Sequence, residues 1–353
     1  MLTSLSLENF KSWHSVEHMR FGRITGLFGT NSSGKTSLLE FLLLLKQTAE
    51  SSDRTQVLNF GSETTPTSLD SFRNVIRNHD TSLHLRYELG WDLGDALRVL
   101  DPDREDSALF SSDSLSVAVE VSGGKQRRLT VDELIYRFAD SDFMMRRKQD
   151  KRAGYELSSP TGFQFKRPPG RPWDLPAPVK CYGFPDEVKA YFLNAGFLSD
   201  FQLAFEDFFK NVYYLGPLRE YPARLYPWSG TTPSDVGKKG EKVIDALLAA
   251  RLNRHRVSLG AGRKALPLDE LVAVWLQKLG LISGFSLHEI EEGGNIYRVN
   301  IKVTPESVEV PITDVGFGVS QVLPVLVLCF YVPKGSVLIF EQPEIHLHPS
   351  VEA

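Results

Sequence analysis

The sequence of 353 residues has only two cysteines and no long apolar run. Cys181 and Cys329 lie far apart, which argues against a disulfide framework and favours a reducing compartment. The longest apolar runs, Leu42 to Leu45 and Val322 to Val332, are much shorter than a membrane-spanning helix, and the second contains Pro324. The chain does not open with a basic segment followed by an apolar stretch. We therefore expect a cytoplasmic protein with no membrane segment and no export signal.

The sequence also has no large excess of charge of either sign, with 40 basic and 44 acidic residues. The formal net charge is −4 and the isoelectric point is near 6.1, which argues against attraction of the whole chain to nucleic acid or anionic lipid. Hydrophobic residues make up 42% of the sequence, enough for a real core. The length fits two ordinary domains or one large α/β domain with insertions.

What the sequence does contain is a phosphate-binding loop. Residues Gly29 to Thr36 match the pattern G-x-x-x-x-G-K-[ST] at every fixed position. The apolar run Ile24 to Phe28 before the loop predicts a buried strand, and the leucine-rich segment Ser37 to Ala49 predicts the helix behind it. This context favours nucleotide binding over a chance turn of glycine and serine.

In such a loop, backbone N–H groups and the start of the following helix point at phosphate oxygens. Lys35 then reaches the β- and γ-phosphates of ATP, and the Thr36 hydroxyl is offered to Mg²⁺. The predicted ATP-binding residues here are Asn31, Ser32, Ser33, Gly34, Lys35, Thr36 and Ser37.

The flanking segments predict a mixed fold. Leu2 to Leu7 and Val16 to Phe21 are typical of short strands, and alternation between Thr81 and Thr130 predicts an antiparallel sheet. The acidic stretch Asp101 to Asp113 within it predicts a mobile loop. Asp186 to Lys210 predicts a phenylalanine-rich helix.

Residues 141–180 differ in composition from the rest. They hold nine lysines and arginines against four acidic residues, with aromatic residues interleaved and six prolines that forbid long regular elements. One interpretation is an insertion that binds nucleic acid or a partner protein. The other is an ordinary solvated loop system, which we favour because the segment has no helix to enter a groove and no recognisable module.

A second half of the site lies near the end of the sequence. Ser336 to Phe340 predicts a buried strand that ends in Glu341, and the carboxyl ends of such strands converge where phosphates bind. We therefore predict that Glu341 binds Mg²⁺ together with Thr36; the alternative is a strand that ends in surface acids. Because 306 residues separate Glu341 from Lys35, counted as 341 − 35, a large insertion must lie between the two halves.

A second glycine-rich segment, Asp314 to Gln321, precedes an apolar helix. A glycine-rich helix start is an anion site, and one P-loop already covers the phosphates from one side. The segment therefore suits a γ-phosphate held by another subunit. Its predicted ATP-binding residues are Gly316, Gly318, Ser320 and Gln321.

Together these motifs resemble the ABC-type ATPase heads of the RecF, structural-maintenance-of-chromosomes (SMC) and overcoming-lysogenisation-defect (OLD) kind, found in many prokaryotic defence ATPases. Five stretches carry the resemblance: Leu7 to Ser12, the P-loop, Gly216 to Arg219, Gly316 to Gln321 as a degenerate signature motif, and Glu341 to Pro349 as Walker B and D-loop. It implies two heads that sandwich two ATP molecules, each P-loop facing the partner's signature motif. The resemblance hardly extends to residues 92–209.

The sequence departs from that family at three places. The signature motif reads Phe317-Gly-Val-Ser-Gln321 where the usual form is L-S-G-G-Q. Gln342 stands where the family has the glutamate that activates water, and an amide cannot act as a general base. Hydrolysis should therefore be slow, or Glu344 must act instead, so the candidate catalytic residues are Glu344 and Gln342. Finally, the sequence stops at Ala353 close to the D-loop, which we interpret as a truncated head or as a head whose sheet is completed elsewhere.

His346 and His348 are spaced by two and lie near Glu344, which raises the question of a metal pair. A third ligand is not evident, and the D-loop explains their position.

The predicted fold class is α/β, a P-loop NTPase of ABC-ATPase type, with a central mostly parallel sheet, an antiparallel β subdomain and a helical insertion. The predicted domains are an N-terminal lobe (1–95), an insertion (96–210) and a C-terminal lobe with the signature and Walker B motifs (211–353). The leading hypothesis is an ATP-gated homo-oligomeric switch, at least a dimer, that controls an effector nuclease or toxin in anti-phage defence. The alternatives are a RecF-like DNA clamp that uses residues 141–180 as its contact, and a nucleotide-binding scaffold that never hydrolyses.

Overall fold

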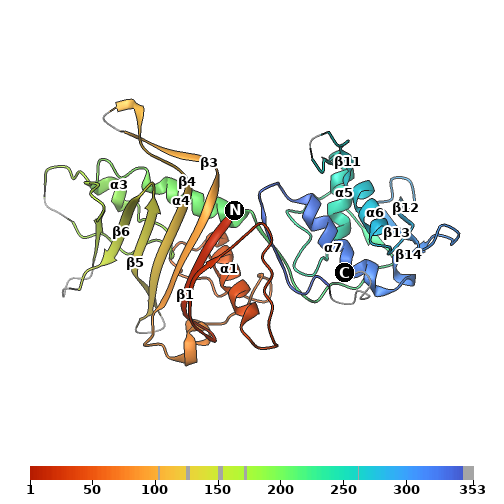
Figure 1. Ribbon diagram of the computed structural model, residues 1–353, viewed down its shortest axis with the longest axis horizontal. Coiled ribbons are helices and arrows are strands. Elements are labelled where there is room, and N and C mark those ends of the chain that lie inside the picture. Colours follow the sequence, from red (N-terminus) through yellow and green to blue (C-terminus); the bar gives the residue numbers. More distant parts are fainter. Residues whose placement is uncertain (102–103, 125–127, 150–153, 171–172, 261, 345–353) are drawn as a thin grey trace. The chain divides into compact units, whose positions relative to one another are not determined.

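The computed structural model describes residues 1–101, 104–124, 128–149, 154–170, 173–260 and 262–344. The chain divides into two compact units, Met1–Val212 and Tyr213–Ala353 (Figure 1), and each is described by itself. The predicted D-loop beyond Glu344, with His346 and His348, lies outside the described residues.

Unit 1 is built on one large antiparallel sheet with the strand order β2-β1-β3-β4-β5-β6-β7. Its strands are β1 (Leu2–Phe10), β2 (Trp13–Arg20), β3 (Leu85–Asp101), β4 (Arg104–Gly123), β5 (Leu129–Phe138), β6 (Ser141–Arg147) and β7 (Tyr155–Ser158). The predicted N-terminal strands and the antiparallel sheet are thus confirmed. No parallel pairing occurs among the described pairs of this sheet, so it corresponds to the predicted antiparallel part of the fold.

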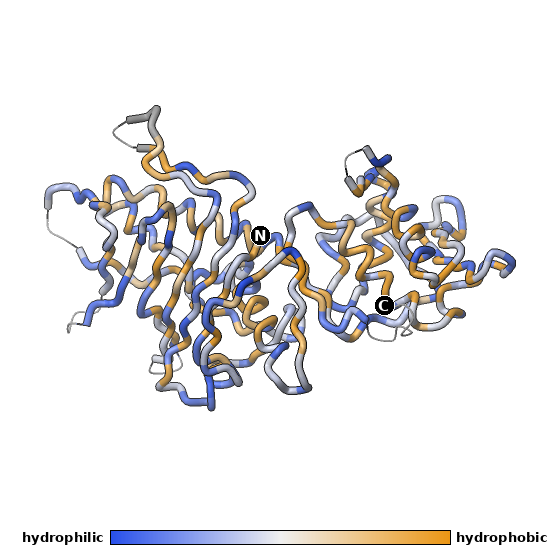
Figure 2. The backbone as a smooth tube through the Cα atoms, in the orientation of Figure 1, coloured by the Kyte–Doolittle hydropathy of each residue, from blue (hydrophilic) through white to orange (hydrophobic). Residues whose placement is uncertain are grey.

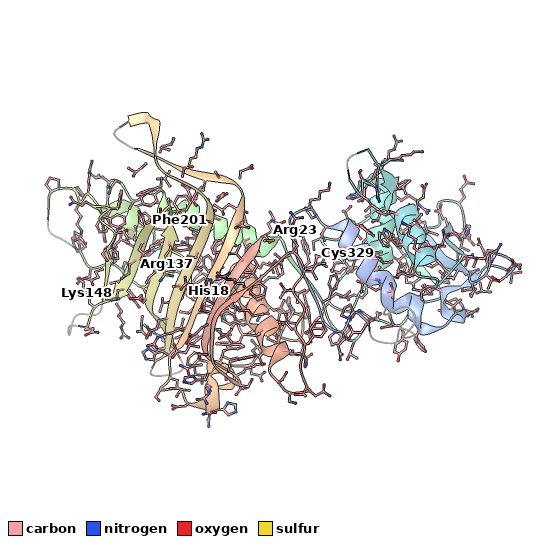
Figure 3. The ribbon with its side chains drawn as sticks, in the orientation of Figure 1. His18, Arg23, Arg137, Lys148, Phe201 and Cys329 are labelled. Atoms are coloured by element: carbon pink, nitrogen blue, oxygen red, sulfur yellow. The ribbon has the colours of Figure 1, made fainter. Side chains whose placement is uncertain are left out.

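Two helices cover one face of this sheet, α1 (Lys35–Glu50) and α4 (Leu198–Lys210). The ring of Phe41 on α1 meets that of Tyr87 on β3 with centroids 5.1 Å apart. The ring of Phe201 on α4, labelled in Figure 3, lies 5.6 Å from that of Tyr136 on β5. Because side chains alternate across a strand, the other sheet face carries the polar residues, and Figure 2 shows this alternation along the strands. The predicted burial of α1 on several sides is confirmed, since its residues 41–48 are all buried.

Three sequence predictions for unit 1 are wrong in detail, and a fourth, for Ile24 to Phe28, is wrong altogether. The acidic segment 101–113 was expected to be a loop, but β3 and β4 pair through much of it, with Val99 opposite Phe110. The single helix over 186–210 is instead α3 (Glu187–Tyr191) and α4, separated by a stretch that contains Gly196. Part of the proline-rich segment pairs as β6 and β7 at the sheet edge, where prolines outside the strands do not interfere.

The run Ile24 to Phe28 was predicted as a buried strand, and this prediction is wrong for the structure. The segment belongs to no strand, and Ile24 and Phe28 are 96% and 94% exposed. An apolar run forms a buried strand only where another element covers it, and none of the described elements of unit 1 covers this run.

The end of α1 is anchored by a buried lysine. Lys180, 6% exposed, donates hydrogen bonds from Nζ to the carbonyls of Ala49 at 3.0 Å and Ser51 at 2.8 Å. Burial lowers the pKa of Lys180, an effect opposed by the nearby carboxyl of Glu206. The ammonium satisfies carbonyls that a helix end leaves without partners.

Neither cysteine forms a disulfide, as expected. Cys181 is buried, which raises the pKa of its thiol to about 11 and keeps it protonated near neutral pH. No helix within the described ranges combines the length and the apolar character needed to cross a bilayer.

Unit 2 packs three helices against small sheets. The helices are α5 (Val243–Leu252), α6 (Leu268–Lys278) and α7 (Phe317–Tyr331). The last of them is the apolar helix predicted at the second glycine-rich segment. One sheet joins β12 (Gly284–Glu289), β13 (Ile296–Lys302), β14 (Val310–Pro311) and β9 (Tyr226–Pro227), and a second joins β8 (Val212–Leu215) to β15 (Val337–Phe340). The core is mostly aliphatic and includes Leu247, Ile301 and Val327, each fully buried.

Candidate nucleotide site

The predicted phosphate-binding loop lies exposed on unit 1, directly before α1. Asn31, Ser32, Ser33 and Thr36 are all exposed, and α1 begins at Lys35. The first turn of α1 holds no acidic residue that would repel an anion. The predicted ATP-binding residues of this motif are therefore brought together at one accessible helix start.

The glycine before the lysine has a steric reason to be glycine. Gly34 adopts φ +90°, which favours glycine, and an added Cβ would come within 2.7 Å of Trp13 Nε1 and 2.8 Å of Ser12 Oγ. Trp13 also donates a hydrogen bond from Nε1 to the Gly34 carbonyl at 3.0 Å. The β1–β2 turn, which carries part of the family resemblance, is thus packed against the P-loop.

Trp13 is a site residue that the sequence analysis did not identify. Its position immediately after the motif that ends in Ser12 was the available signal. Next to it, Lys11 forms an ion pair with Glu40 on α1, which further ties the turn to the helix.

Lys35 folds back over its own loop. Its Nζ donates to the carbonyls of Gly29 at 2.6 Å and Thr30 at 2.7 Å, and lies 3.5 Å from Ser33 Oγ. The ammonium is therefore placed over the concave side of the loop, where a phosphate group would gain a charge-assisted hydrogen bond. Exposed hydroxyls, glycine backbone and a positioned ammonium fit the phosphates of a nucleotide.

The predicted magnesium acid lies in unit 2, directly after β15. Glu341 Oε1 accepts a hydrogen bond from the Tyr214 hydroxyl at 2.7 Å, and the Glu341 N–H donates to the Leu215 carbonyl at 3.1 Å. The Arg219 guanidinium donates to the Glu341 carbonyl at 3.3 and 3.4 Å. A carboxylate held in this way offers a hard oxygen ligand of the kind Mg²⁺ prefers, as does the hydroxyl of Thr36 in unit 1.

Arg219 is 7% exposed, which is unusual for a cation. Burial lowers its pKa, and the neighbouring Tyr214 hydroxyl and Glu341 carboxyl oppose that effect. The Gly216 to Arg219 loop, noted in the sequence, therefore has a clear local role: it fixes the backbone at Glu341.

The same loop reaches the start of α7. The Tyr221 ring meets the Phe317 ring edge-on with centroids 5.6 Å apart, and Arg224 pairs with Asp314 at 2.9 Å. Two of the predicted motifs of unit 2, the magnesium acid and the signature segment, are thus linked through residues 219–224.

Within the signature segment, the predicted residues face different ways. Gly316 caps α7 and is exposed, and Gly318 is half-buried in the first turn. Ser320 and Gln321 are only 7% and 6% exposed, and Ser320 Oγ donates to the Phe317 carbonyl at 2.8 Å. The accessible part of the segment is accordingly its glycine backbone and the exposed ring of Phe317.

The candidate catalytic residues Gln342 and Glu344 are both exposed. Gln342 has φ +46°, a left-handed conformation that few residues other than glycine adopt and that is often found at functional sites. The side chain beside the magnesium acid is thus an accessible amide, which lacks the basicity to take a proton from water.

The basic segment offers less free charge than its composition suggested. Arg146 donates from Nε to Glu133 at 2.6 Å, Arg147 pairs with Asp132 at 3.3 Å, and Lys148, labelled in Figure 3, pairs with Asp174. These three cations are matched by carboxylates of the same unit.

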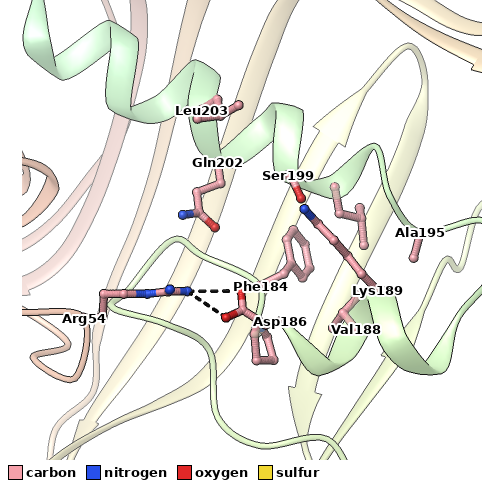
Figure 4. A pocket seen from close by; sticks show the side chains of 11 residues that line it. Arg54, Phe184, Asp186, Val188, Lys189, Ala195, Ser199, Gln202 and Leu203 are labelled. Atoms are coloured by element: carbon pink, nitrogen blue, oxygen red, sulfur yellow. Dashed lines mark hydrogen bonds and ion pairs between the residues drawn. The ribbon is translucent and has the colours of Figure 1, made fainter.

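A separate pocket of about 220 Å³ lies between α3 and α4 in unit 1 (Figure 4). Arg54 faces Asp186 across it at 3.2 Å, with Lys189, Ser199 and Gln202 on the surrounding wall. None of the P-loop residues lines this pocket.

Comparisons with known proteins agree with the motifs. Residues 1–154 match the model of the AAA ATPase domain, and residues 180–353 match a model described as "AAA domain, putative AbiEii toxin, Type IV TA system". A solved chain from work on "ATP-driven dimerization and DNA stimulated activation of SMC ATPases" is similar at 17% identity over 38% of this chain and 68% of that chain, with a TM-score of 0.20. None of the curated proteins matches.

Proposed function

We propose, from the premise that this chain is an AAA-type ATPase of the P-loop NTPase fold, that it works as a slow, ATP-gated switch. The premise follows from the two family matches, which cover both halves of the chain. The observation that carries the proposal is Gln342, an exposed amide directly after the well-held Glu341.

The proposed roles follow from the chemistry of the residues. The exposed loop Asn31 to Ser37 binds the phosphates of ATP, with Lys35 as the cation. Thr36 and Glu341 supply oxygen ligands for Mg²⁺, which when bound neutralises phosphate charge. Tyr214 and Arg219 orient Glu341 and hold its backbone.

Dimerisation follows from the second glycine-rich helix start. The first turn of α7 carries no acidic residue, the cap residue Gly316 is exposed and Gly318 is half-buried. We assign this end of α7 to the γ-phosphate of an ATP molecule held by a second copy of the chain. Binding energy then favours association of two heads, and ATP loss separates them.

The output of the switch is assigned to a partner effector, a nuclease or a toxin, in prokaryotic anti-phage defence. Support comes from the family description of residues 180–353, which names a putative toxin of a toxin–antitoxin system. The sequence motifs include no independent nuclease constellation, so the effector is assigned to another chain.

The alternative of a DNA-repair clamp has less support. Its predicted contact includes Arg146, Arg147 and Lys148, and all three already pair with carboxylates. A cation engaged in this way releases fewer counterions when it meets a phosphate backbone. A scaffold that binds nucleotide without hydrolysis differs from the proposed switch only in its turnover.

Steady-state ATP hydrolysis tests the slow switch. We expect turnover well below about 1 per second, the lower end of typical enzymes, and a further fall in Glu344→Ala if that carboxylate acts as the base. Turnover above that value which is unchanged in Glu344→Ala would contradict the proposal.

A further inference from the structure

A group of ligand-type side chains lies on unit 1 away from the nucleotide loop. His84, Glu120 and Asp132, here called the His84 cluster, each offer one ligand atom, and these atoms lie within 4.8 Å of one another. The three residues are half-buried. Imidazole and carboxylate ligands together are typical of sites for zinc and related first-row metals.

The strand register explains why these residues meet. His84 directly precedes β3, Glu120 lies on β4 and Asp132 lies on β5, three neighbouring strands of the sheet. Glu120 pairs with Glu133, whereas Val121 pairs with Val131, so Asp132 is the extra residue of a β-bulge. Bulges redirect a side chain, and this one adds Asp132 to the polar face beside Glu120.

Each carboxylate is oriented by an arginine. Arg147 binds one oxygen of Asp132, whereas Arg86 binds both oxygens of Glu120, with its Nη2 donating to Glu120 Oε1 at 3.2 Å. Arg86 Nε pairs with Glu120 Oε2 at 3.1 Å, and Arg147 Nη1 pairs with Asp132 Oδ1 at 3.3 Å. Glu120 Oε1 also hydrogen bonds to His84 Nδ1, and Asp132 Oδ2 lies 3.8 Å from the same nitrogen. Such outer contacts commonly fix the ligands of a metal.

Asp132 Oδ2 is the atom that the protein leaves unsatisfied. It is buried and has no hydrogen-bond partner among the described residues, although a buried carboxylate oxygen normally has one. His84 itself is fixed on the other side, since Asn9 Nδ2 donates to the His84 carbonyl at 2.9 Å. An atom that approaches both Asp132 Oδ2 and His84 Nδ1 would complete the coordination of both.

We propose that the His84 cluster binds a divalent transition metal, with Zn²⁺ as its representative, and that the metal cross-links β3, β4 and β5. Ligand atoms of a tetrahedral zinc site lie roughly 3.4 Å apart, given bonds of about 2.0 to 2.2 Å, so the 3.8 Å separation of His84 and Asp132 requires only a small shift. The metal takes the place of the proton shared by His84 and Glu120, and water fills the remaining position.

Local charge also favours a cation. The carboxylates that face the cluster are those of Glu8, Glu120 and Asp132, and the guanidinium groups among them are those of Arg86 and Arg147. A bound divalent ion offsets the excess of carboxylate around His84.

Calorimetric titration of the full chain with ZnCl₂ tests the site. The background for all variants carries His346→Ala and His348→Ala, which removes the two histidines that are spaced by two in the sequence. We expect one equivalent of Zn²⁺ to bind in the micromolar range, and His84→Ala and Asp132→Asn each to weaken binding at least about tenfold. The control variant is His288→Ala. The native His288 ring pairs with Glu309 at 3.5 Å, away from the cluster, so this variant should bind Zn²⁺ as tightly as the background does.

Thermal unfolding gives an independent readout that covers variants of low stability. Zn²⁺ should raise the melting temperature of the background and of His288→Ala but not of Asp132→Asn, which keeps the shape of the native side chain. Absence of Zn²⁺ binding at concentrations up to about 1 mM, a free energy of only about 4 kcal/mol, would overturn the proposal. Binding that is equally strong in His84→Ala and Asp132→Asn would overturn it too.

Discussion

The P-loop of unit 1 and Glu341 of unit 2, the proposed magnesium ligand, are held in contrasting ways. The loop is exposed and offers backbone, hydroxyls and an ammonium that rests on the carbonyls of Gly29 and Thr30. Glu341 is fixed by two side chains, one of them the buried Arg219. The loop offers groups that can bind an anion, whereas Glu341 is held by hydrogen bonds and is followed by the amide of Gln342. This difference fits the proposal that the protein binds ATP well but hydrolyses it slowly.

Replacing Gln342 with glutamate should have the largest effect on this comparison. A carboxylate at this position can act as a general base, and such catalysis contributes about 10²- to 10⁴-fold. We therefore expect Gln342→Glu to raise kcat for ATP hydrolysis by at least about 100-fold. Phosphate release assays measure this, with Gln342→Asn as the amide control. If the wild type already hydrolyses ATP rapidly and Gln342→Glu does not change the rate, Gln342 does not limit hydrolysis and the contrast drawn above is wrong.

Removing the cation of the first half should mainly reduce binding. Lys35→Ala loses a hydrogen bond to a charged group, worth about 1.5 to 3 kcal/mol, so ATP affinity should fall about 10- to 100-fold. Equilibrium binding of a fluorescent ATP analogue measures the change. Lys264→Ala, which alters an exposed lysine of unit 2, serves as the matched control. Equal affinity in both variants would show that the loop is not the phosphate site.

Removing a contact that holds Glu341 should weaken the binding of Mg²⁺ more than the binding of ATP. Tyr214→Phe removes the hydroxyl that donates to Glu341 Oε1 at 2.7 Å and keeps the ring. Loss of such an outer contact typically weakens a metal about tenfold or more, so the Mg²⁺ concentration needed for half-maximal activity should rise about tenfold. In the control Tyr226→Phe the lost hydroxyl instead accepts the Ala223 N–H at 2.9 Å. A shift of equal size in both variants would argue against a specific role of Tyr214.

The smallest effect is expected for DNA binding by the basic segment, residues 141–180, which lies outside both the P-loop and the region of Glu341. Neutralising Arg146, Arg147 and Lys148 together should change duplex DNA binding less than about twofold, because each already pairs with an acid. Binding at two salt concentrations measures this, with an equal charge change at exposed residues of unit 2 as control: Arg254, Arg256 and Lys264. Tight, salt-sensitive binding that is lost only in the first variant would instead support the DNA clamp.

Local patterns predicted the elements that depend on neighbours in sequence. The P-loop motif located the start of α1, and the alternation in residues 81–130 located the core of the antiparallel sheet. The prediction for Ile24 to Phe28 was wrong because burial of a strand depends on distant partners. Trp13 was missed for a related reason, since its contact with Gly34 joins residues 21 positions apart.

In the candidate site, residue types were easier to predict than their orientation. Sequence identified Ser320, but only the structure places its hydroxyl against the Phe317 carbonyl, inside the first turns of α7. Sequence also identified Glu341 and the Gly216 to Arg219 loop separately. Their contact depends on β8 and β15 pairing from opposite ends of unit 2, which no local pattern encodes.

The molar mass in solution, measured by light scattering with and without ATP and Mg²⁺, tests ATP-gated association most directly. For the wild type we predict the mass of a single chain, 39.7 kDa, without nucleotide and at least a doubling with it. Lys35→Ala should keep the same mass in both conditions, and Lys264→Ala should behave as the wild type. A wild-type mass that does not respond to ATP and Mg²⁺ would contradict the account.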